Sequence, residues 1–231
     1  MKKIILNLLV LSTAIWAASF NEGDYAYNKG NYQDASKVWQ KKCNSGDSKS
    51  CNNLGVLYEN AQGVKKDYKK ASQLYKQACD QNKSDACYNL AILYQNGKGV
   101  KQNFAKTSEL FTKACDSGDA YACNNLGVLY KNGKGVKRNF TKASQLFNKA
   151  CASNIASGCY NLGVLYENAQ GLKQDYKKAK QLYQKACDSG DAHSCYNLGA
   201  LYKNGKGVIK DEKKANQLYE KACKDGGCSR K

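Results

Sequence analysis

The sequence lacks proline altogether, and no segment alternates apolar and polar residues over more than a few positions. These two absences favour a chain made of helices rather than strands. Histidine occurs only once, at His193, which excludes a zinc site built from several histidines. The motifs S-x-x-K, S-D-N, K-T-G and H-E-x-x-H are also missing. The sequence therefore offers no known catalytic motif, and we expect no cofactor.

Only one long apolar run occurs, and it lies at the start of the chain. Lys2 and Lys3 precede an apolar segment over residues 4–16, and the small residues 17–19 follow it. This layout is typical of a secretory signal peptide, and the run is too short to span a bilayer stably. We predict a signal peptide over residues 1–19 and a mature chain without a transmembrane segment. An uncleaved membrane anchor is the alternative.

Acidic residues are few, because 19 Asp and Glu stand against 37 Lys and Arg and give a formal net charge of +18. In a cytosolic protein this excess would suggest nucleic acid as a partner. Behind a secretion signal it indicates a solvated, lysine-rich exterior, or attraction to acidic surfaces such as anionic lipids and glycans. We therefore expect no nucleic-acid partner.

Cysteine, by contrast, is abundant, and all 12 cysteines lie in the predicted mature part of the chain. An even and dense set behind a secretion signal is typical of a disulfide framework in an oxidising compartment. The sequence thus predicts that the protein is secreted or periplasmic.

The chain repeats itself with a period of 36 residues. Leucine, tyrosine and glycine recur at this interval from Leu54, Tyr58 and Gly63 onward. We expect one array over residues 20–231, in which a partial unit at 20–47 precedes units that start near 48, 84, 120, 156 and 192. Two sets of cysteines follow the same interval, namely Cys43, Cys79, Cys115, Cys151, Cys187 and Cys223, and Cys51, Cys87, Cys123, Cys159 and Cys195.

Each unit has the pattern of two helices. Leu54, Leu57 and Tyr58 have the spacing of an apolar stripe on one helical face. Gly-Lys-Gly or Ala-Gln-Gly then ends the helix, because glycine accepts a left-handed backbone easily, and an Asp or Asn follows that can cap the next helix. Since one small hairpin cannot bury its stripe alone, the units must stack. The sequence predicts an all-α fold, an α/α superhelical solenoid of two-helix repeats.

The second helix of every unit carries a large aromatic residue. Helical spacing favours a core position for these side chains, and a ligand-binding cluster is the alternative. They are Trp39, Tyr75, Phe111, Phe147, Tyr183 and Tyr219.

Neighbouring cysteines have the spacing C-x7-C. On one continuous helix this spacing would place the two Cα atoms about 12 Å apart, beyond the limit of roughly 7 Å for a disulfide, so the chain must turn between them. Zinc binding is the rival interpretation, but zinc sites use C-x2-4-C pairs that converge in fours, and we expect no metal. A shorter C-x4-C pair at the C-terminal end is expected to bridge as well. The predicted disulfides are Cys43–Cys51, Cys79–Cys87, Cys115–Cys123, Cys151–Cys159, Cys187–Cys195 and Cys223–Cys228.

The string CYNLGALYKNGKGV at 195–208, followed by KKANQLYEKAC, resembles the Sel1-like repeat, a relative of the tetratricopeptide repeat. With C-x7-C in every unit and a secretion signal, the chain is similar to the Helicobacter cysteine-rich protein family. This resemblance implies a disulfide-stapled α/α superhelix outside the cytoplasm. Members of that family carry the label of weak penicillin-binding proteins or β-lactamases, so the resemblance also implies hydrolase activity on cyclic amides.

Sel1-like and tetratricopeptide arrays, which this chain resembles, line a concave groove with their first helices. The stripe that the core leaves free carries one asparagine per unit, and this side chain can pair with the backbone of an extended peptide. We predict a monomeric scaffold that binds a peptide or protein, or a ligand related to β-lactams or peptidoglycan, on this ladder. The alternative is that the asparagines tie neighbouring loops together. The ladder is Asn53, Asn89, Asn125, Asn161 and Asn197.

Two further expectations concern asparagines, one for the ladder and one for a second series. Replacing Asn89, Asn125 and Asn161 by alanine should abolish ligand capture while thermal unfolding stays unchanged. A second series precedes each glycine turn, where helix-end capping is expected, and consists of Asn60, Asn96, Asn132, Asn168 and Asn204.

β-Lactam hydrolysis is the alternative function, and it would need an activated nucleophile and an oxyanion site. His193 has the position of a variable helix-start residue, while Ser45, Ser117 and Ser189 have the positions of turn formers. The residues that would carry out such a reaction are therefore unknown from the sequence.

Overall fold

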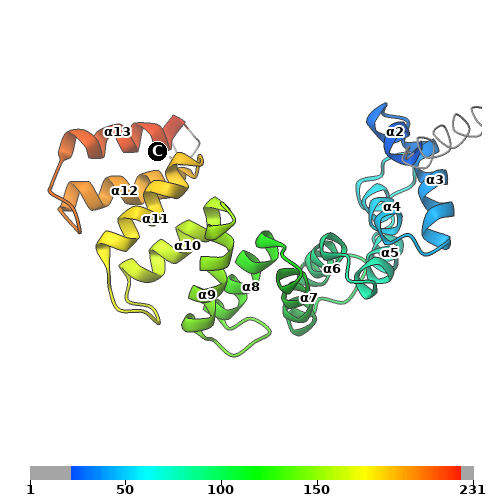
Figure 1. The fold of residues 1–231 in the computed structure, drawn as a ribbon, viewed down its shortest axis with the longest axis horizontal. Coiled ribbons are helices and arrows are strands. Elements are labelled where there is room, and N and C mark those ends of the chain that lie inside the picture. The colour runs from blue at the N-terminus through cyan, green and yellow to red at the C-terminus, as the bar shows by residue number, and fades with distance from the viewer. Residues whose placement is uncertain (1–21, 225–231) are drawn as a thin grey trace, which may run out of the picture. The chain divides into compact units, whose positions relative to one another are not determined.

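The structure, a computed structural model, describes residues 22–224, so the predicted signal peptide and Cys228 lie outside the described residues (Figure 1). Within this range the chain forms twelve α-helices and no strand, which confirms the all-α fold class. The helices are α2 (Glu22–Asn28), α3 (Tyr32–Asn44), α4 (Ser48–Asn60), α5 (Tyr68–Asp80), α6 (Ser84–Asn96), α7 (Phe104–Asp116), α8 (Ala120–Asn132), α9 (Phe140–Ala152), α10 (Ala156–Glu167), α11 (Tyr176–Asp188), α12 (Ala192–Asn204) and α13 (Glu212–Lys224).

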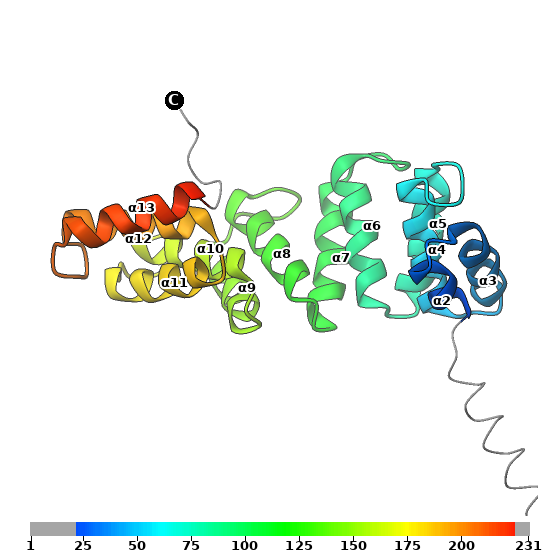
Figure 2. The same cartoon turned by 90° about the horizontal axis from the view of Figure 1, so that it is seen from above.

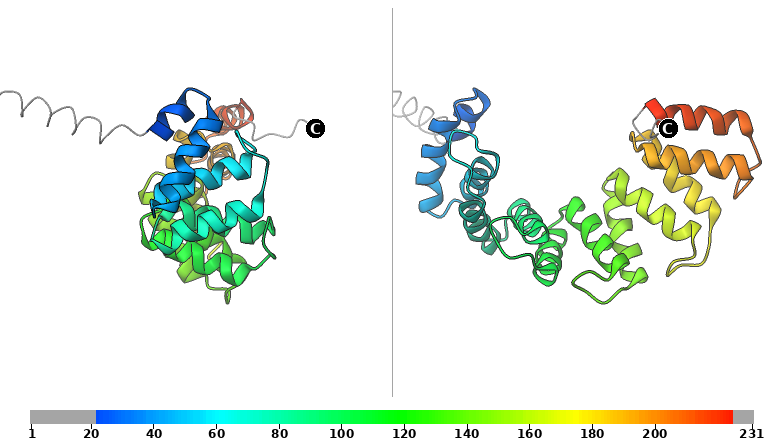
Figure 3. Two further views of the ribbon diagram at one scale, coloured as in Figure 1. Left: turned by 90° about the vertical axis from the view of Figure 1, so that its right-hand side faces the viewer. Right: turned by 180° about the vertical axis from the view of Figure 1, so that it is seen from behind.

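These helices belong to two compact units. The first unit holds α2 to α5, the first turn of α6 and residues 98–101, and the second holds the rest of α6 and α7 to α13. In the second unit, successive helices lie side by side as hairpins, which Figures 2 and 3 show for α10 with α11 and for α12 with α13. The expectation of one continuous array over residues 20–231 remains a prediction. None of the helices between residues 22 and 224 has the length and apolar character that a membrane crossing requires.

Polar side chains cap the second helix of each hairpin, as predicted from the sequence. The side-chain oxygen of the residue before the helix accepts a hydrogen bond of 2.8–3.0 Å from the third backbone N–H that follows. This geometry satisfies a donor that a helix start otherwise leaves unpaired. The capping residues are Asp67, Asn103, Asn139, Asp175 and Asp211.

The prediction that glycine supplies the left-handed helix stop is wrong in two units. Gly97, Gly133 and Gly205 take this conformation where the first helix ends, but Ala61 and Ala169 take it with φ of 58° and 54°. A Cβ makes this backbone region unfavourable by about 1 kcal/mol or more. The two Ala-Gln-Gly loops are therefore held by their surroundings rather than by the preference of the stop residue.

Aromatic side chains of the second helices form the core between the paired helices. Tyr75, Phe111, Phe147 and Tyr183 are fully buried, and Trp39 is 3% exposed, which confirms the core assignment for these five. In three of the hairpins, the fully buried ring lies against a glycine of the first helix. A Cβ added at this glycine would come within 2.6–2.7 Å of the ring. The pairs are Gly55 with Tyr75, Gly127 with Phe147, and Gly163 with Tyr183.

Disulfides connect second helices with the first helices that follow them. Four bridges are described, with Cα–Cα distances of 4.5 to 4.7 Å: Cys43–Cys51, Cys115–Cys123, Cys151–Cys159 and Cys187–Cys195. Cys79, Cys87 and Cys223 are also disulfide-bonded, and no cysteine between residues 22 and 224 is free. The expected partner of Cys223, Cys228, lies outside the described residues.

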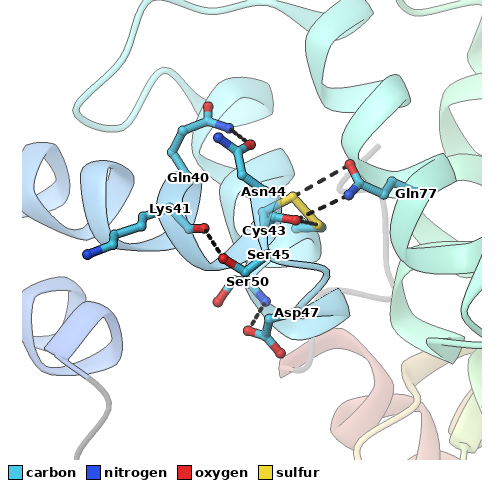
Figure 4. The surroundings of a disulfide bond; sticks show 9 residues. Gln40, Lys41, Cys43, Asn44, Ser45, Asp47, Ser50 and Gln77 are labelled. Carbon is cyan, nitrogen blue, oxygen red and sulfur yellow. Dashed lines mark hydrogen bonds between the residues drawn. A yellow bond between two sulfur atoms is a disulfide. The ribbon is translucent and has the colours of Figure 1, made fainter.

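A side chain from the next second helix fixes the backbone at some of these bridges. In Figure 4, the Gln77 Nε2 donates a hydrogen bond of 3.2 Å to the carbonyl oxygen of Cys43, and the Gln77 Oε1 lies 3.7 Å from the Cys43 Sγ. Lys185 repeats this contact 108 residues later in the sequence, because its Nζ donates a hydrogen bond of 2.8 Å to the carbonyl oxygen of Cys151. These contacts order the disulfide turns relative to the neighbouring hairpin.

Candidate functional site

The structure places the five ladder asparagines at one repeated position on the first helices α4, α6, α8, α10 and α12. Their side chains do not all have the same surroundings, however. The hydrogen-bond partners of each asparagine decide whether its amide group is available to a ligand.

Asn125 and Asn161 are bonded to the first helix of the preceding hairpin. The Asn125 Nδ2 donates to the Tyr88 Oη at 3.3 Å, and the Asn161 Nδ2 donates to the Asn124 Oδ1 at 3.0 Å. In both cases the acceptor stands 37 positions earlier in the sequence. Asn161 is also buried. At these two positions the asparagine ties neighbouring first helices together, rather than neighbouring loops as the alternative interpretation of the ladder proposed.

Two other members of the ladder have partners as well. The Asn197 side chain is hydrogen-bonded to the buried Tyr183, and Asn89 has an interaction within the chain. Neither residue is therefore without a partner in the chain.

Asn53 differs from the other four because its side chain makes no hydrogen bond with the described part of the chain. It lines a hollow of about 300 Å³ in the first unit, between α2, α3 and α4. An amide group without an internal partner can pair with a ligand without breaking a native bond. The hollow is lined by Asn53 together with Asp24, Tyr27, Asn28, Trp39, Lys49 and Val56.

This hollow combines opposite charges with an aromatic wall. The Lys49 Nζ lies 2.6 Å from the Asp24 Oδ2, and the two side chains are 56% and 31% exposed, so a ligand can reach both. The Trp39 ring packs against the Tyr27 ring with centroids 5.5 Å apart. The Trp39 Nε1 is buried and has no hydrogen-bond partner in the described structure. Polar groups above an aromatic and aliphatic surface are typical of a small ligand site.

A second hollow of about 300 Å³ lies in the second unit. It is lined by polar residues and by apolar ones such as Phe104 and Val128, and the polar ones include Gln95, Asn96, Asn125, Asn132 and Lys134. The Gln102 Nε2, at the edge of this hollow, donates a hydrogen bond of 2.8 Å to the carbonyl oxygen of Gln95. The Asn125 amide already bonds to Tyr88, so the ladder asparagine of this hollow, unlike Asn53 in the first, has a partner within the described chain.

Two members of the second series of asparagines contribute to helix ends, as expected from the sequence. The Asn168 Nδ2 donates 3.0 Å to the carbonyl oxygen of Val164, and the Asn204 Nδ2 donates 2.9 Å to that of Ala200. Both satisfy carbonyl groups in the last turn of a helix.

The residues considered for catalysis are not brought together. His193 is exposed, and its ring centroid lies 6.1 Å from that of Tyr160. The hydroxyl groups of Ser45 and Ser189 donate to backbone carbonyls of their own helices at 3.1 and 3.0 Å. The buried hydroxyl of Ser194 has no partner and is out of reach of a substrate. Between residues 22 and 224, no three His, Cys, Asp or Glu side chains cluster in a way that could hold a metal ion.

Sequence reasoning missed the Asp24–Lys49 pair, because its members lie 25 positions apart and Asp24 belongs to the partial first unit, where the repeat gives no guide. It also missed the acceptors of the ladder. A signal for them exists, since the position before each ladder asparagine is always Asn or Tyr, at 52, 88, 124, 160 and 196.

The repeat, the paired helices and the disulfide turns define a class of protein. The model of the Sel1 repeat family matches five consecutive segments, 48–83, 84–119, 120–155, 156–191 and 192–227. The chain therefore belongs to the Sel1 repeat family.

Individual relatives refine this assignment. A Helicobacter pylori protein described as "Putative beta-lactamase HcpE" is 39% identical over 66 residues, which are 27% of this chain and only 19% of that relative. This match confirms the resemblance to the Helicobacter cysteine-rich proteins. The solved Sel1 repeat protein of Oxalobacter formigenes is 34% identical, with a TM-score of 0.81 over 89% of this chain and 84% of its own. The protective antigen c5321 of uropathogenic Escherichia coli is 28% identical, with a TM-score of 0.81 over 85% of this chain and 42% of its own.

Proposed function

We propose that the protein is a binding scaffold that works outside the cytoplasm and holds a peptide segment of another molecule in the hollow between α2, α3 and α4. The observation that carries this proposal is the free amide group of Asn53 beside the Asp24–Lys49 ion pair. The disulfides support a location in an oxidising compartment, because such bonds persist there and are rare in the cytosol.

The chemistry of the hollow fits a peptide in three ways. The Asn53 amide can donate to a backbone carbonyl and accept from a backbone N–H at the same time. Lys49 and Asp24 can each exchange part of their mutual ion pair for a charged group of the ligand, since both are partly exposed. Val56 and Tyr27 provide an apolar surface for a side chain.

A display experiment tests this function without a known ligand. A phage-displayed library of short random peptides is selected on the oxidised protein, and the enriched peptides are synthesised. We expect Asn53→Ala and Asp24→Ala to weaken their binding by about tenfold or more, because each removes a direct polar contact. Asn148→Ala serves as the matched control, since Asn148 is an exposed asparagine on the second helix α9.

Thermal unfolding of the Asn53→Ala variant should match that of the parent protein, because the amide has no hydrogen-bond partner in the described part of the chain to lose. A library from which no peptide is enriched would contradict the proposal. So would equal losses of binding in the Asn53 and Asn148 variants.

β-Lactam binding or hydrolysis is a second candidate, and the similarity to the Helicobacter pylori relative named above favours it. Incubation of the oxidised protein with a chromogenic β-lactam separates the two. Binding without turnover leaves the absorbance flat, whereas hydrolysis raises it steadily and would assign an enzymatic function.

A further inference from the structure

The hairpin loops of the second unit stack along one edge. Gly171 lies against Phe140 and Thr141 at the start of α9, and Gly207 lies against Tyr176 and Lys177 at the start of α11. A Cβ at either glycine would collide with this backbone, so each loop sits directly on the beginning of the preceding second helix. We call the resulting surface, formed by residues 133–142, 169–178 and 205–214, the hairpin edge.

The hairpin edge is strongly basic. Its three segments contain eleven Lys and Arg side chains but only three acidic ones, Asp175, Asp211 and Glu212. The two aspartates accept hydrogen bonds from helix-start N–H groups, and Glu212 lies 2.8 Å from the Lys210 Nζ. The accessible charge on this edge is therefore positive along its whole length.

The opposite edge of the same unit carries the disulfide turns, and its charged residues are acidic instead of basic. Segments 116–122, 152–158 and 188–194 contain four aspartates and no lysine or arginine. Two lysines that adjoin this edge are engaged, because Lys185 donates to the carbonyl oxygen of Cys151 and the Lys221 Nζ lies 3.9 Å from Asp188. Of the two edges of the second unit, the hairpin edge is therefore the basic one.

Aromatic rings hold many of the basic side chains of the hairpin edge in place. The lysine amines lie 4.6–5.6 Å from the ring centroids, and the Arg138 guanidinium lies 5.7 Å from that of Phe140. All of these basic residues remain exposed. Stacking on a ring limits the freedom of a long side chain while leaving its charge accessible. The lysine pairs are Lys134 with Phe104, Lys142 with Tyr130, Lys178 with Tyr166, Lys206 with Tyr176 and Lys214 with Tyr202.

The last loop of the hairpin edge also presents an apolar side chain. Ile209 is 91% exposed, the largest exposed fraction among the large hydrophobic residues of the described chain. The other hairpin loops of the second unit carry Lys137 and Lys173 at this position. Lys206 and Lys210 flank Ile209 in the sequence. An isolated apolar side chain within a basic surface is suited to a partner whose surface is negatively charged and which has an apolar layer beneath that surface. The lysines can contact the charges while the apolar side chain enters the layer.

We infer that the hairpin edge docks on a bilayer that contains anionic lipids, with its lysines on the phosphate groups and Ile209 inserted below them. Lysines near such a surface are attracted by its negative potential, and an inserted aliphatic side chain adds apolar burial that a soluble polyanion cannot provide. This surface is separate from the hollow in the first unit, so the two activities can be lost independently.

Vesicle co-sedimentation of the full mature chain tests this inference. We expect binding to vesicles of phosphatidylglycerol and phosphatidylcholine, no binding to pure phosphatidylcholine, and weaker binding as the salt concentration rises. Lys137→Glu with Lys173→Glu should lower the affinity by about tenfold or more. Both lysines are exposed loop residues, so the fold should be unaffected.

The matched control is Lys149→Glu with Lys221→Glu, which changes the net charge equally but lies in the last turns of α9 and α13. We expect this control to bind almost as well as the parent protein. Ile209→Ser should weaken vesicle binding several-fold and leave binding to heparin, a soluble polyanion, unchanged. Failure to bind anionic vesicles at physiological salt would overturn the inference, as would equal losses in the two lysine variants. An Ile209→Ser variant that binds vesicles like the parent would assign the edge to a soluble polyanion instead.

Discussion

The hydroxyl group of Tyr183 donates a hydrogen bond of 2.7 Å to the Oε2 of Glu167. Tyr183 is fully buried against Gly163, while Glu167 ends the same helix α10 and is partly exposed. The first unit repeats this arrangement, with 2.8 Å between the Tyr75 hydroxyl and Glu59. The bond joins the buried end of each ring to the surface of the hairpin.

Tyr183→Phe should lower the free energy of unfolding by about 1 kcal/mol, because the carboxylate loses its donor. The variant Tyr183→Phe with Glu167→Gln should recover part of this loss, since the natural hairpin with Phe111 carries Gln95 at the corresponding position. Urea unfolding measures both. Tyr196→Phe, at a residue that is 50% exposed, is the control and should change stability little. An equal loss in the two tyrosine variants would contradict the role of the hydrogen bond.

The same two tyrosines predict the behaviour of the protein in alkali. Burial, together with the neighbouring Glu59 or Glu167 carboxylate, raises the pKa of Tyr75 and Tyr183 above the ordinary value of about 10. The unfolded chain therefore releases these protons at a pH where the folded chain still holds them. Stability is fully present below about pH 10 and should fall above it, by about 1.4 kcal/mol per pH unit for each tyrosine.

Unfolding temperatures between pH 8 and pH 12 check this prediction. The variant that carries both Tyr75→Phe and Tyr183→Phe should show a shallower decline than the parent protein. Parallel curves for the two proteins would show that other groups, such as the lysines, cause the alkaline loss.

The repeat pattern was enough to predict the helices, their caps, the buried aromatic residues and the fold class. These features depend on the spacing of residues within one unit, which the sequence displays directly. The binding residues are different. Asn53 and Asn161 occupy the same repeat position. The amide of Asn161 is engaged because Asn124 supplies an acceptor, whereas the amide of Asn53 has no such acceptor among residues 22–224.

The left-handed alanines show a similar limit of sequence reasoning. Ala61 and Ala169 begin the two Ala-Gln-Gly strings, and alanine as a residue type favours a helical backbone. Both nevertheless have positive φ. The conformation is imposed by the loop, since Gly63 and Gly171 must still contact the preceding hairpin. A single-residue preference cannot predict a backbone that tertiary packing dictates.

Ala61→Gly and Ala169→Gly should therefore stabilise the protein by up to about 1 kcal/mol each, because glycine removes the Cβ strain at a positive φ. Thermal or urea unfolding measures the gain. Ala105→Gly, on the exposed first turn of α7, is the control and should destabilise the protein by about 0.5 kcal/mol. A loss of stability at Ala61 or Ala169 would contradict the left-handed assignment.

The disulfide turns should contribute strongly to stability. Replacing Cys151 and Cys159 together by alanine should lower the free energy of unfolding by about 2.5 kcal/mol, according to the loop-closure relation for this short turn. Reduction of the parent protein should lower its unfolding temperature. It should lower the unfolding temperature of Asn148→Ala, a control at a residue outside the bridges, to the same extent. An unfolding temperature that does not respond to reduction would contradict a structural role of the bridges.

Asn161→Ala and Asn53→Ala remove the same amide group from the same repeat position, and the structure predicts opposite consequences. Asn161 is buried and bonded to Asn124, so its loss leaves a buried acceptor unpaired and should destabilise the protein by about 1–3 kcal/mol. Asn53 has no hydrogen-bond partner among residues 22–224, so its loss should leave unfolding unchanged. The expectation from the sequence that alanine at Asn125 and Asn161 leaves thermal unfolding unchanged is therefore revised.

Urea unfolding of the two single variants decides between these roles. If Asn161→Ala proves as stable as the parent protein, the bond to Asn124 makes no net contribution, and the amide of Asn161 is available to a ligand without a loss of stability. If Asn53→Ala loses as much stability as Asn161→Ala, the amide of Asn53 is structural, and the hollow between α2, α3 and α4 loses the group on which its proposed function depends.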